Sequence, residues 1–104
     1  MSNPGIDDHD AEILAETFHL LGDATRLRIV IACLAEPVSV GDIAERVAAS
    51  PSLVSHHLRL LKAARLVRAE RRGKQVFYSA ADDHVRTMLS DMIAHVAEPD
   101  EDAS

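Results

Sequence analysis

Apolar side chains recur at intervals of three and four residues in five stretches of this chain, which is the pattern of helices that bury one face. Residues that begin helices precede two of them: Asp23 is an N-cap, and Ser50 is an N-cap followed by Pro51 at the first helical position. Gly22 and Pro37 end the first two stretches. The predicted helices are residues 11–21, 24–34, 40–48, 51–63 and 82–98.

Each predicted helix has one apolar face, which we expect to be buried in the first four helices and to support the pairing of two chains in the last. The members of these faces are Ile13, Leu14, Thr17, Phe18 and Leu21; Leu27, Val30, Ile31 and Leu34; Ile43, Ala44 and Val47; Leu53, Val54, Leu58 and Leu61; and Val85, Met88, Leu89, Met92, Ile93 and Val96.

The pattern changes to a period of two after Arg65, over the segment LVRAERRGKQVFYSA, which predicts a β-hairpin with residues 72–74 at its tip. Two short helices joined by a tight turn precede this hairpin, as in a helix-turn-helix, and a basic hairpin after the second helix is a wing. The predicted fold is therefore mainly α with a small β-hairpin, a winged helix-turn-helix over residues 11–98. Residues 1–10 and 99–104 have no apolar period and are predicted to be a disordered arm and a disordered acidic tail.

Charge is distributed unevenly along the chain, although the total is −6. Residues 52–78 carry seven basic and one acidic side chain, whereas the segments on either side are both strongly acidic. A basic block of this kind is typical of a nucleic-acid contact surface. Its side chains are supplied by the second helix of the helix-turn-helix and by the wing: Ser52, Ser55, His56, His57, Arg59, Lys62, Arg68, Arg71, Arg72 and Lys74. A solvated charged hairpin is the alternative for the wing.

Composition excludes several other classes of protein. The chain has no apolar run of membrane-spanning length and an acidic, polar start, so we expect a cytoplasmic protein. The single cysteine, Cys33, excludes an internal disulfide framework and lies in an apolar run, where we expect it to be buried. An enzyme is not expected, because the chain has no nucleophile–base pair and no glycine-rich phosphate loop.

The last predicted helix also carries residue types that bind divalent metals, in the pattern Asp82-x-His84 and His95-x-x-Glu98. His84 and His95 are eleven residues apart, so they lie on one side of the helix but roughly 16 Å apart along its axis. One metal ion cannot contact both within one chain. If two copies pack antiparallel about a two-fold axis, Asp82 and His84 of one chain meet His95 and Glu98 of the other, in two symmetric sites. The alternative is a dimerisation helix with solvated polar residues.

The order of these elements, with LGDATRLRIV, SPSLVSHHLRLLKAARLV and GKQVFYS, resembles the ArsR/SmtB family of metal-responsive repressors over residues 12–98. The resemblance implies a zinc site formed by the four last-helix residues across a dimer built from the N- and C-terminal helices. It also implies DNA contact at Ser52, Ser55 and His56, and a hydrogen bond from the metal-bound His95 to the backbone carbonyl of Arg65. The family's cysteine-containing site is not expected, since Ser39 stands at the cysteine position.

The expected function is thus a repressor that binds operator DNA as a metal-free homodimer and is released by zinc or cobalt. Nickel would need further ligands, for which His9, Asp100 and Asp102 are available. Three alternatives remain open: a repressor that responds to nickel or to no metal, one that holds zinc constitutively, and a metal-binding interaction or storage protein without operator specificity.

Overall fold

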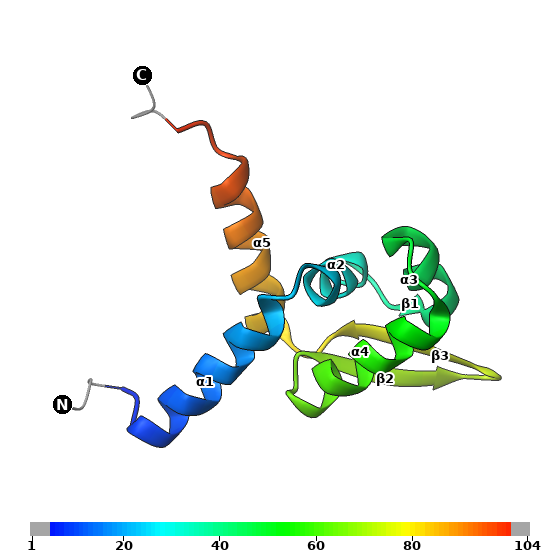
Figure 1. Ribbon diagram of the computed structural model, residues 1–104, viewed down its shortest axis with the longest axis horizontal. Helices are drawn as coiled ribbons and strands as arrows, with labels where there is room; N and C mark the ends of the chain where they lie inside the picture. Colours follow the sequence, from blue (N-terminus) through cyan, green and yellow to red (C-terminus); the bar gives the residue numbers. More distant parts are fainter. Residues whose placement is uncertain (1–4, 101–104) are drawn as a thin grey trace.

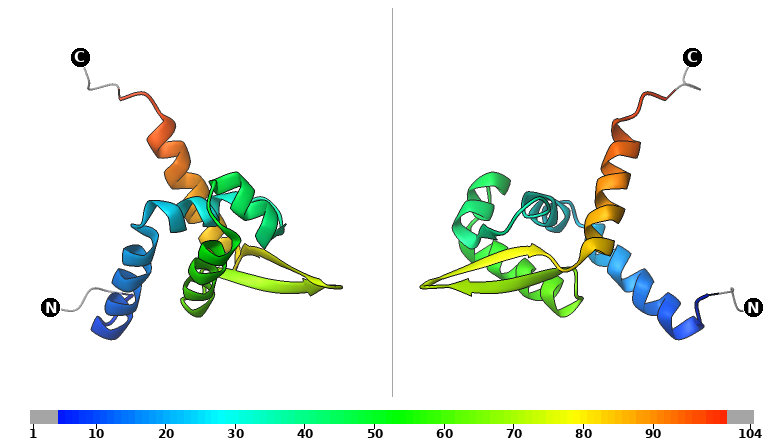
Figure 2. Two further views of the ribbon diagram at one scale, coloured as in Figure 1. Left: turned by 45° about the vertical axis from the view of Figure 1, so that its right-hand side comes forward. Right: turned by 180° about the vertical axis from the view of Figure 1, so that it is seen from behind.

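The computed structural model of this protein describes residues 5–100, and Figures 1 and 2 show their arrangement. The elements in chain order are α1 (Asp8–Leu21), α2 (Ala24–Ala32), β1 (Val38–Ser39), α3 (Val40–Val47), α4 (Pro51–Ala63), β2 (Val67–Arg72), β3 (Gln75–Ala80) and α5 (Asp83–Ala97).

The helix-turn-helix consists of α3 and α4, joined by the turn of residues 48–50, in which Ala48 is left-handed (φ 55°). The caps predicted from sequence are present: Asp23 accepts a hydrogen bond from the Arg26 amide (2.9 Å), and Ser50 accepts one from the Leu53 amide (3.1 Å). Because these caps satisfy amides in the first turn that have no partner within the helix, they fix where α2 and α4 begin. The predicted bounds of α4 agree with the structure.

The wing is an antiparallel hairpin of β2 and β3, with Val67 opposite Ala80 and Arg72 opposite Gln75. Gly73 occupies the turn with a φ of +62°, which a residue without a Cβ adopts without strain. The sequence pattern did not predict β1. This short strand pairs with the other edge of β3, with Val38 opposite Tyr78, so the sheet has three strands in the order β1-β3-β2.

The core lies where α2, α3 and α4 pack together and against the sheet. Its fully buried side chains include Ile29, Val30, Ile43, Val54, Leu58 and Leu61. These residues come from three different helices, so burying them fixes the orientation of α4 relative to the rest of the domain. The winged helix-turn-helix fold predicted from sequence is confirmed.

Helices α1 and α5 project from one side of this core and diverge toward their outer ends (Figures 1 and 2). The Cα radius of gyration is 15.5 Å, compared with about 13 Å for a compact domain of 100 residues. The two terminal helices therefore add length to the molecule without being folded back onto its core.

The bounds of α1 correct one prediction. α1 begins at Asp8, because Asp7 accepts a hydrogen bond from the Asp10 amide (2.8 Å), so the predicted disordered arm is wrong for residues 8–10. Of the other residues predicted to be disordered, 1–4 and 101–104 lie outside the described residues. In the protomer, large apolar side chains of α1 and of the outer half of α5 are exposed, together with one of α2: Ile13, Leu14, Phe18, Met92, Ile93, Val96 and, from α2, Ile31.

Candidate metal centre and nucleic-acid interface

Helix α4 presents a polar, basic outer surface. Val54, Leu58 and Leu61 hold its inner face in the core, which turns the opposite face to solvent. Among the predicted DNA contacts on this helix, Ser55 is half-buried and the exposed ones are Ser52, His56, Arg59 and Lys62. A helix with this surface at the second position of a helix-turn-helix can enter the major groove, with its first turn nearest the base edges.

Leu53, which the apolar pattern assigned to the buried face of α4, is instead 44% exposed. Successive helical residues are about 100° apart, so a helix that points Val54 into the core leaves Leu53 on its flank. The apolar character of Leu53 alone led to the wrong assignment. The surface of the first turn of α4 therefore includes one large apolar side chain beside Ser52 and His56.

His57, also predicted to contact DNA, is half-buried and turned toward α2. Its Nδ1 accepts a hydrogen bond from Arg26 Nε (3.3 Å), while Arg26 NH1 donates to the Leu20 carbonyl (3.3 Å). The pKa of the nearby Asp23 carboxylate is held below its ordinary value, mainly by the hydrogen bond from the Arg26 amide. These contacts join the end of α1, the start of α2 and the middle of α4.

The C-terminal end of α4 is closed by a Schellman motif. The Arg65 amide donates to the Lys62 carbonyl (3.0 Å), and the Leu66 amide donates to the Leu61 carbonyl (2.9 Å). Arg65 has a φ of +62°, a left-handed conformation that is unusual for a residue with a Cβ. The motif thus fixes the backbone at Arg65, the residue expected to receive the hydrogen bond from His95.

The wing carries its basic side chains in two settings. Arg72 pairs with Glu70 (3.0 Å) and lies over the Phe77 ring, 5.0 Å from its centroid, and Arg68 donates to the Ser79 hydroxyl (3.3 Å). Arg71 and Lys74 are exposed near the tip. The wing therefore offers exposed cations at a surface adjoining α4, as backbone-contacting wings require.

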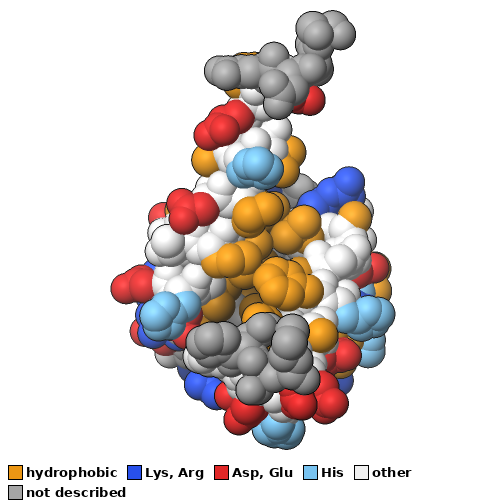
Figure 3. Space-filling view, turned by 90° about the vertical axis from the view of Figure 1, so that its left-hand side faces the viewer, with side chains coloured by type: hydrophobic (Ala, Val, Ile, Leu, Met, Phe, Trp, Pro, Cys, Tyr) orange, Lys and Arg blue, Asp and Glu red, His pale blue; other side chains and the backbone are white. Residues whose placement is uncertain are grey.

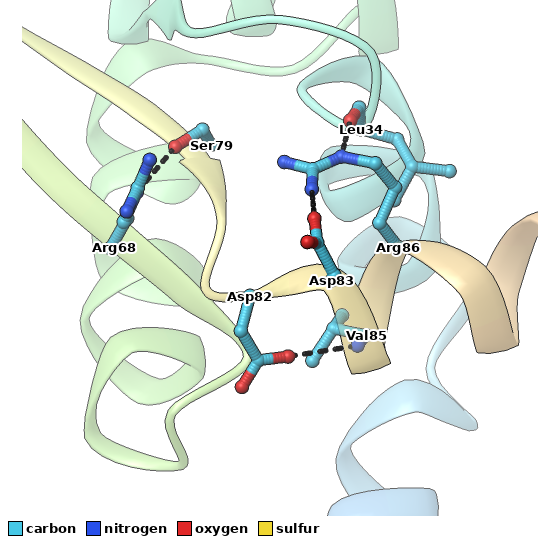
Figure 4. A network of polar contacts seen from close by, with 7 residues as sticks. All are labelled: Leu34, Arg68, Ser79, Asp82, Asp83, Val85 and Arg86. Atoms are coloured by element: carbon cyan, nitrogen blue, oxygen red, sulfur yellow. Dashed lines mark hydrogen bonds and ion pairs between the residues drawn. The ribbon is translucent and has the colours of Figure 1, made fainter.

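The base of α5 is tied to the core by polar contacts (Figure 4). Arg86 Nε donates to the Leu34 carbonyl (3.1 Å), and the same guanidinium pairs with Asp83. Asp82 caps the helix through one carboxylate oxygen, which accepts from the Val85 amide (3.0 Å). Asp82 also lines a shallow pocket with Lys62, Arg65 and Arg68, so the start of α5 adjoins the end of α4.

The four predicted metal ligands are not brought together within one protomer. Asp82 and His84 lie at the start of α5, His95 lies in its last turn, and Glu98 is its C-cap. All four side chains are exposed, and residues 5–100 contain no cluster of three or more His, Cys, Asp or Glu arranged to hold a metal ion. Two imidazoles and two carboxylates suit zinc chemically, but the protomer supplies only half of such a set at either end of α5.

An apolar groove runs beside these polar residues, between α2 and α5. Its lining contains no polar surface and consists of Leu27, Ile31, Leu89, Met92, Ile93, Val96 and Ala97. Figure 3 shows hydrophobic side chains gathered over this side of the molecule, continuing toward the base of α5. Val96 is 80% exposed, so the described part of the chain leaves the apolar side of the outer half of α5 largely uncovered.

The remaining sequence predictions concern Ser39 and Cys33. Ser39, at the position of the family's cysteine ligand, caps α3 by accepting a hydrogen bond from the Asp42 amide (3.3 Å). Cys33 is buried as predicted, its thiol donates to the Ile29 carbonyl (3.4 Å), and burial raises its pKa to about 11. Neither residue is therefore in a setting that favours a reactive thiolate site.

Comparison with known proteins agrees with this architecture. Residues 23–69, from the cap of α2 into the wing, match the family model described as bacterial regulatory protein, arsR family. A transcriptional repressor SmtB homolog from Synechocystis sp. is 40% identical over 90 residues, which cover 86% of this chain and 68% of the relative. The chain belongs to the ArsR/SmtB family.

Solved structures of similar proteins have the same fold. The cadmium metal-sensor CMTR from Mycobacterium tuberculosis is 34% identical with a TM-score of 0.68, over 86% of this chain and 94% of that one. A homodimeric winged helix-turn-helix DNA-binding domain from Mycobacterium bovis is 26% identical with a TM-score of 0.75, over 89% and 91%. This ArsR/SmtB protein is thus a DNA-binding transcriptional repressor of the metal-sensor type and not an enzyme. None of its helices within residues 5–100 is long and apolar enough to cross a membrane.

Proposed function

We propose that this protein binds operator DNA as a metal-free homodimer and is released when zinc, or cobalt, binds at two symmetric sites between the α5 helices. The observation that carries the proposal is the separation of the four ligand residues into two half-sites at opposite ends of one exposed helix. Such an arrangement is incomplete in one chain and complete in an antiparallel pair.

The exposed apolar surface supplies a reason for the chains to pair. Large apolar side chains on α1 and α5 are exposed, as is Ile31 of α2. Figure 3 shows hydrophobic side chains gathered on one side of the protomer. Contiguous apolar surface of this kind marks an interaction site, and a second copy of the same face is the partner that also completes the ligand set. Homodimerisation of the Mycobacterium bovis relative is consistent with this assignment.

In the proposed dimer, Asp82 and His84 of one subunit face His95 and Glu98 of the other. The donor set fits the proposed metal: Asp82 caps α5 with one oxygen and retains the second, and both imidazoles are exposed. When bound, the metal would supply a strong cross-link between two chains at a tetrahedral centre. Zinc and cobalt both accept such a nitrogen and oxygen set without thiolates.

The DNA-binding surface of each subunit would be α4 and the wing. Arg59, Lys62, Arg71 and Lys74 are exposed and suited to phosphate contacts, as are Arg68 and Arg72 once their hydrogen-bonding partners are exchanged. Ser52, Ser55 and His56 lie toward the base edges. His57 holds α4 against α2 through its hydrogen bond with Arg26. Because that bond uses Nδ1, Nε2 is the ring nitrogen with which His57 would contact DNA.

The link between the two sites would run through the pocket that the base of α5 and the end of α4 line together. Asp82 adjoins Arg65 there, and Arg65 is held in a fixed left-handed conformation. His95 of the second subunit, ligating through one ring nitrogen, would donate its other N–H to the Arg65 carbonyl. That bond would favour a dimer geometry in which the two α4 helices no longer fit successive major grooves, and DNA would weaken metal binding by the same factor.

Fluorescence anisotropy tests this proposal with duplex DNA selected from a random-sequence pool by the metal-free protein. We expect zinc to release the bound duplex from the parent protein. In His84→Ala, zinc should no longer release it. His19→Ala is the matched control, because His19 is exposed on α1, on the side opposite Ile13, Leu14 and Phe18. Tight DNA binding that is indifferent to zinc and cobalt in the parent protein would refute the proposal.

A further inference from the structure

The large exposed apolar side chains of the described chain divide into two groups. Seven of them belong to α1, α2 and α5, where the proposed dimer would cover them. The other two, Leu53 and Leu60, lie on α4, the helix proposed to enter DNA. Leu53 is 44% exposed and Leu60 is 38% exposed, so the two are closely matched in type and exposure.

Their positions along α4 differ. Leu53 is in the first turn, and Leu60 is seven residues later, about 10 Å further along the helix axis. The second helix of a helix-turn-helix contacts base edges with its N-terminal residues. In the proposed complex, Leu53 would therefore be among the residues that reach the base edges, and Leu60 would lie about two turns beyond them.

The first turn of α4 is also rigid. The Leu53 amide is bound to the Ser50 hydroxyl (3.1 Å), Pro51 precedes it, and the adjacent Val54 is fully buried. Its backbone position is thus fixed by the core, and a leucine side chain has less conformational entropy to lose on binding than arginine or lysine. An apolar group held in this way can make a defined contact.

In the major groove, the only apolar group that a base edge presents is the 5-methyl of thymine. We propose that Leu53 contacts this methyl group and makes the protein prefer thymine at one position of each operator half-site. The inference rests on the proposed entry of α4 into the major groove. Ser52 and His56, which are exposed next to Leu53, would supply the hydrogen bonds to neighbouring base edges.

Replacement of single thymines by deoxyuridine tests this inference, because it removes the methyl group and leaves every hydrogen-bonding group in place. The probe is a duplex selected from a random-sequence pool by the metal-free wild-type protein. At one thymine per half-site, we expect deoxyuridine to weaken wild-type binding by about fourfold, the factor that corresponds to one buried methyl group. Other thymines should give no more than a small change.

Two variants then assign the effect to a side chain. Leu53→Ala should bind the thymine duplex several-fold more weakly and should no longer distinguish thymine from deoxyuridine at that position. Leu60→Ala should retain both wild-type affinity and discrimination. The inference is overturned if Leu53→Ala still discriminates as the wild type does, or if no thymine responds. Failure to select any duplex would instead refute the proposed operator binding, and this inference with it.

Discussion

Arg26 Nε donates a hydrogen bond to His57 Nδ1 at 3.3 Å, joining the start of α2 to the middle of α4. The same guanidinium reaches the Leu20 carbonyl at the end of α1. Since α1 belongs to the proposed dimer interface and α4 to the proposed DNA surface, this pair of residues connects two surfaces that the function requires to stay in register.

Removal of the acceptor should therefore affect both stability and DNA binding. We expect His57→Ala to lower the free energy of unfolding by about 1 kcal/mol, the usual value of one such hydrogen bond, and to weaken DNA binding. His57→Gln retains an acceptor oxygen and should recover most of both losses. Urea unfolding and DNA anisotropy measure the two effects, and equal behaviour of the two variants would contradict this role.

The outer half of α5 should be needed for dimerisation. Val96→Glu places a charge on its 80%-exposed apolar face and should convert the dimer to monomer at micromolar concentration in sedimentation velocity. Thr87→Glu introduces the same charge nine residues earlier, two and a half turns away on the opposite face of α5, and should remain dimeric. Dimers of unchanged stability in Val96→Glu would place the interface elsewhere.

The wing should contribute to the salt dependence of DNA binding. If Arg71 contacts a phosphate in each half-site, Arg71→Gln should reduce the slope of log K against log salt by about 1.8 for the dimer, roughly 0.9 for each contact. Arg28→Gln removes the same charge from α2, outside the basic block, and should leave the slope nearly unchanged. A salt titration that gave the two variants the same slope would argue against a phosphate contact by the wing.

The buried thiol of Cys33 should make the stability of the protein depend on pH in the alkaline range. Burial raises the pKa of its thiol from 9.0 to about 11, so the folded state disfavours the thiolate that the unfolded chain forms. The contribution of the protonated Cys33 thiol to the free energy of unfolding is fully present below about pH 9. It is lost as the pH rises toward 11, by roughly 2–3 kcal/mol at most. Comparison of the pH dependence of unfolding with that of Cys33→Ala measures this loss. A thiol reagent that labels the native protein rapidly at pH 8 would contradict the burial.

Local chemistry made much of this fold predictable. Asp23, Ser50 and Pro51 determine where α2 and α4 begin, and each could be recognised from its residue type and position alone. β1 could not be recognised, because two residues carry no alternation. Helical periodicity identified the apolar faces of α1 and α5 correctly, but a period does not say whether such a face is covered by the same chain or by another.

The candidate site was predictable only in part for the same reason. The eleven-residue spacing of His84 and His95 is enough by itself to require a second chain for a shared metal ion. The exposure of Leu53 and the bond between Arg26 and His57 depend on how α4 is rotated against α2 and α3, which tertiary packing decides. The adjacency of Asp82 and Arg65 likewise follows from the path of the wing between α4 and α5.

The most direct test of the central claim combines two inactive variants in one dimer. A His84→Ala chain and a His95→Ala chain, each carrying a different affinity tag, are mixed, and the heterodimer is purified. If each site takes His84 from one subunit and His95 from the other, one of the two sites in the heterodimer keeps both histidines. Zinc titration should then give about one tightly bound ion per heterodimer and none in either parent homodimer. A heterodimer that binds no more zinc than its parents would contradict the site between the subunits.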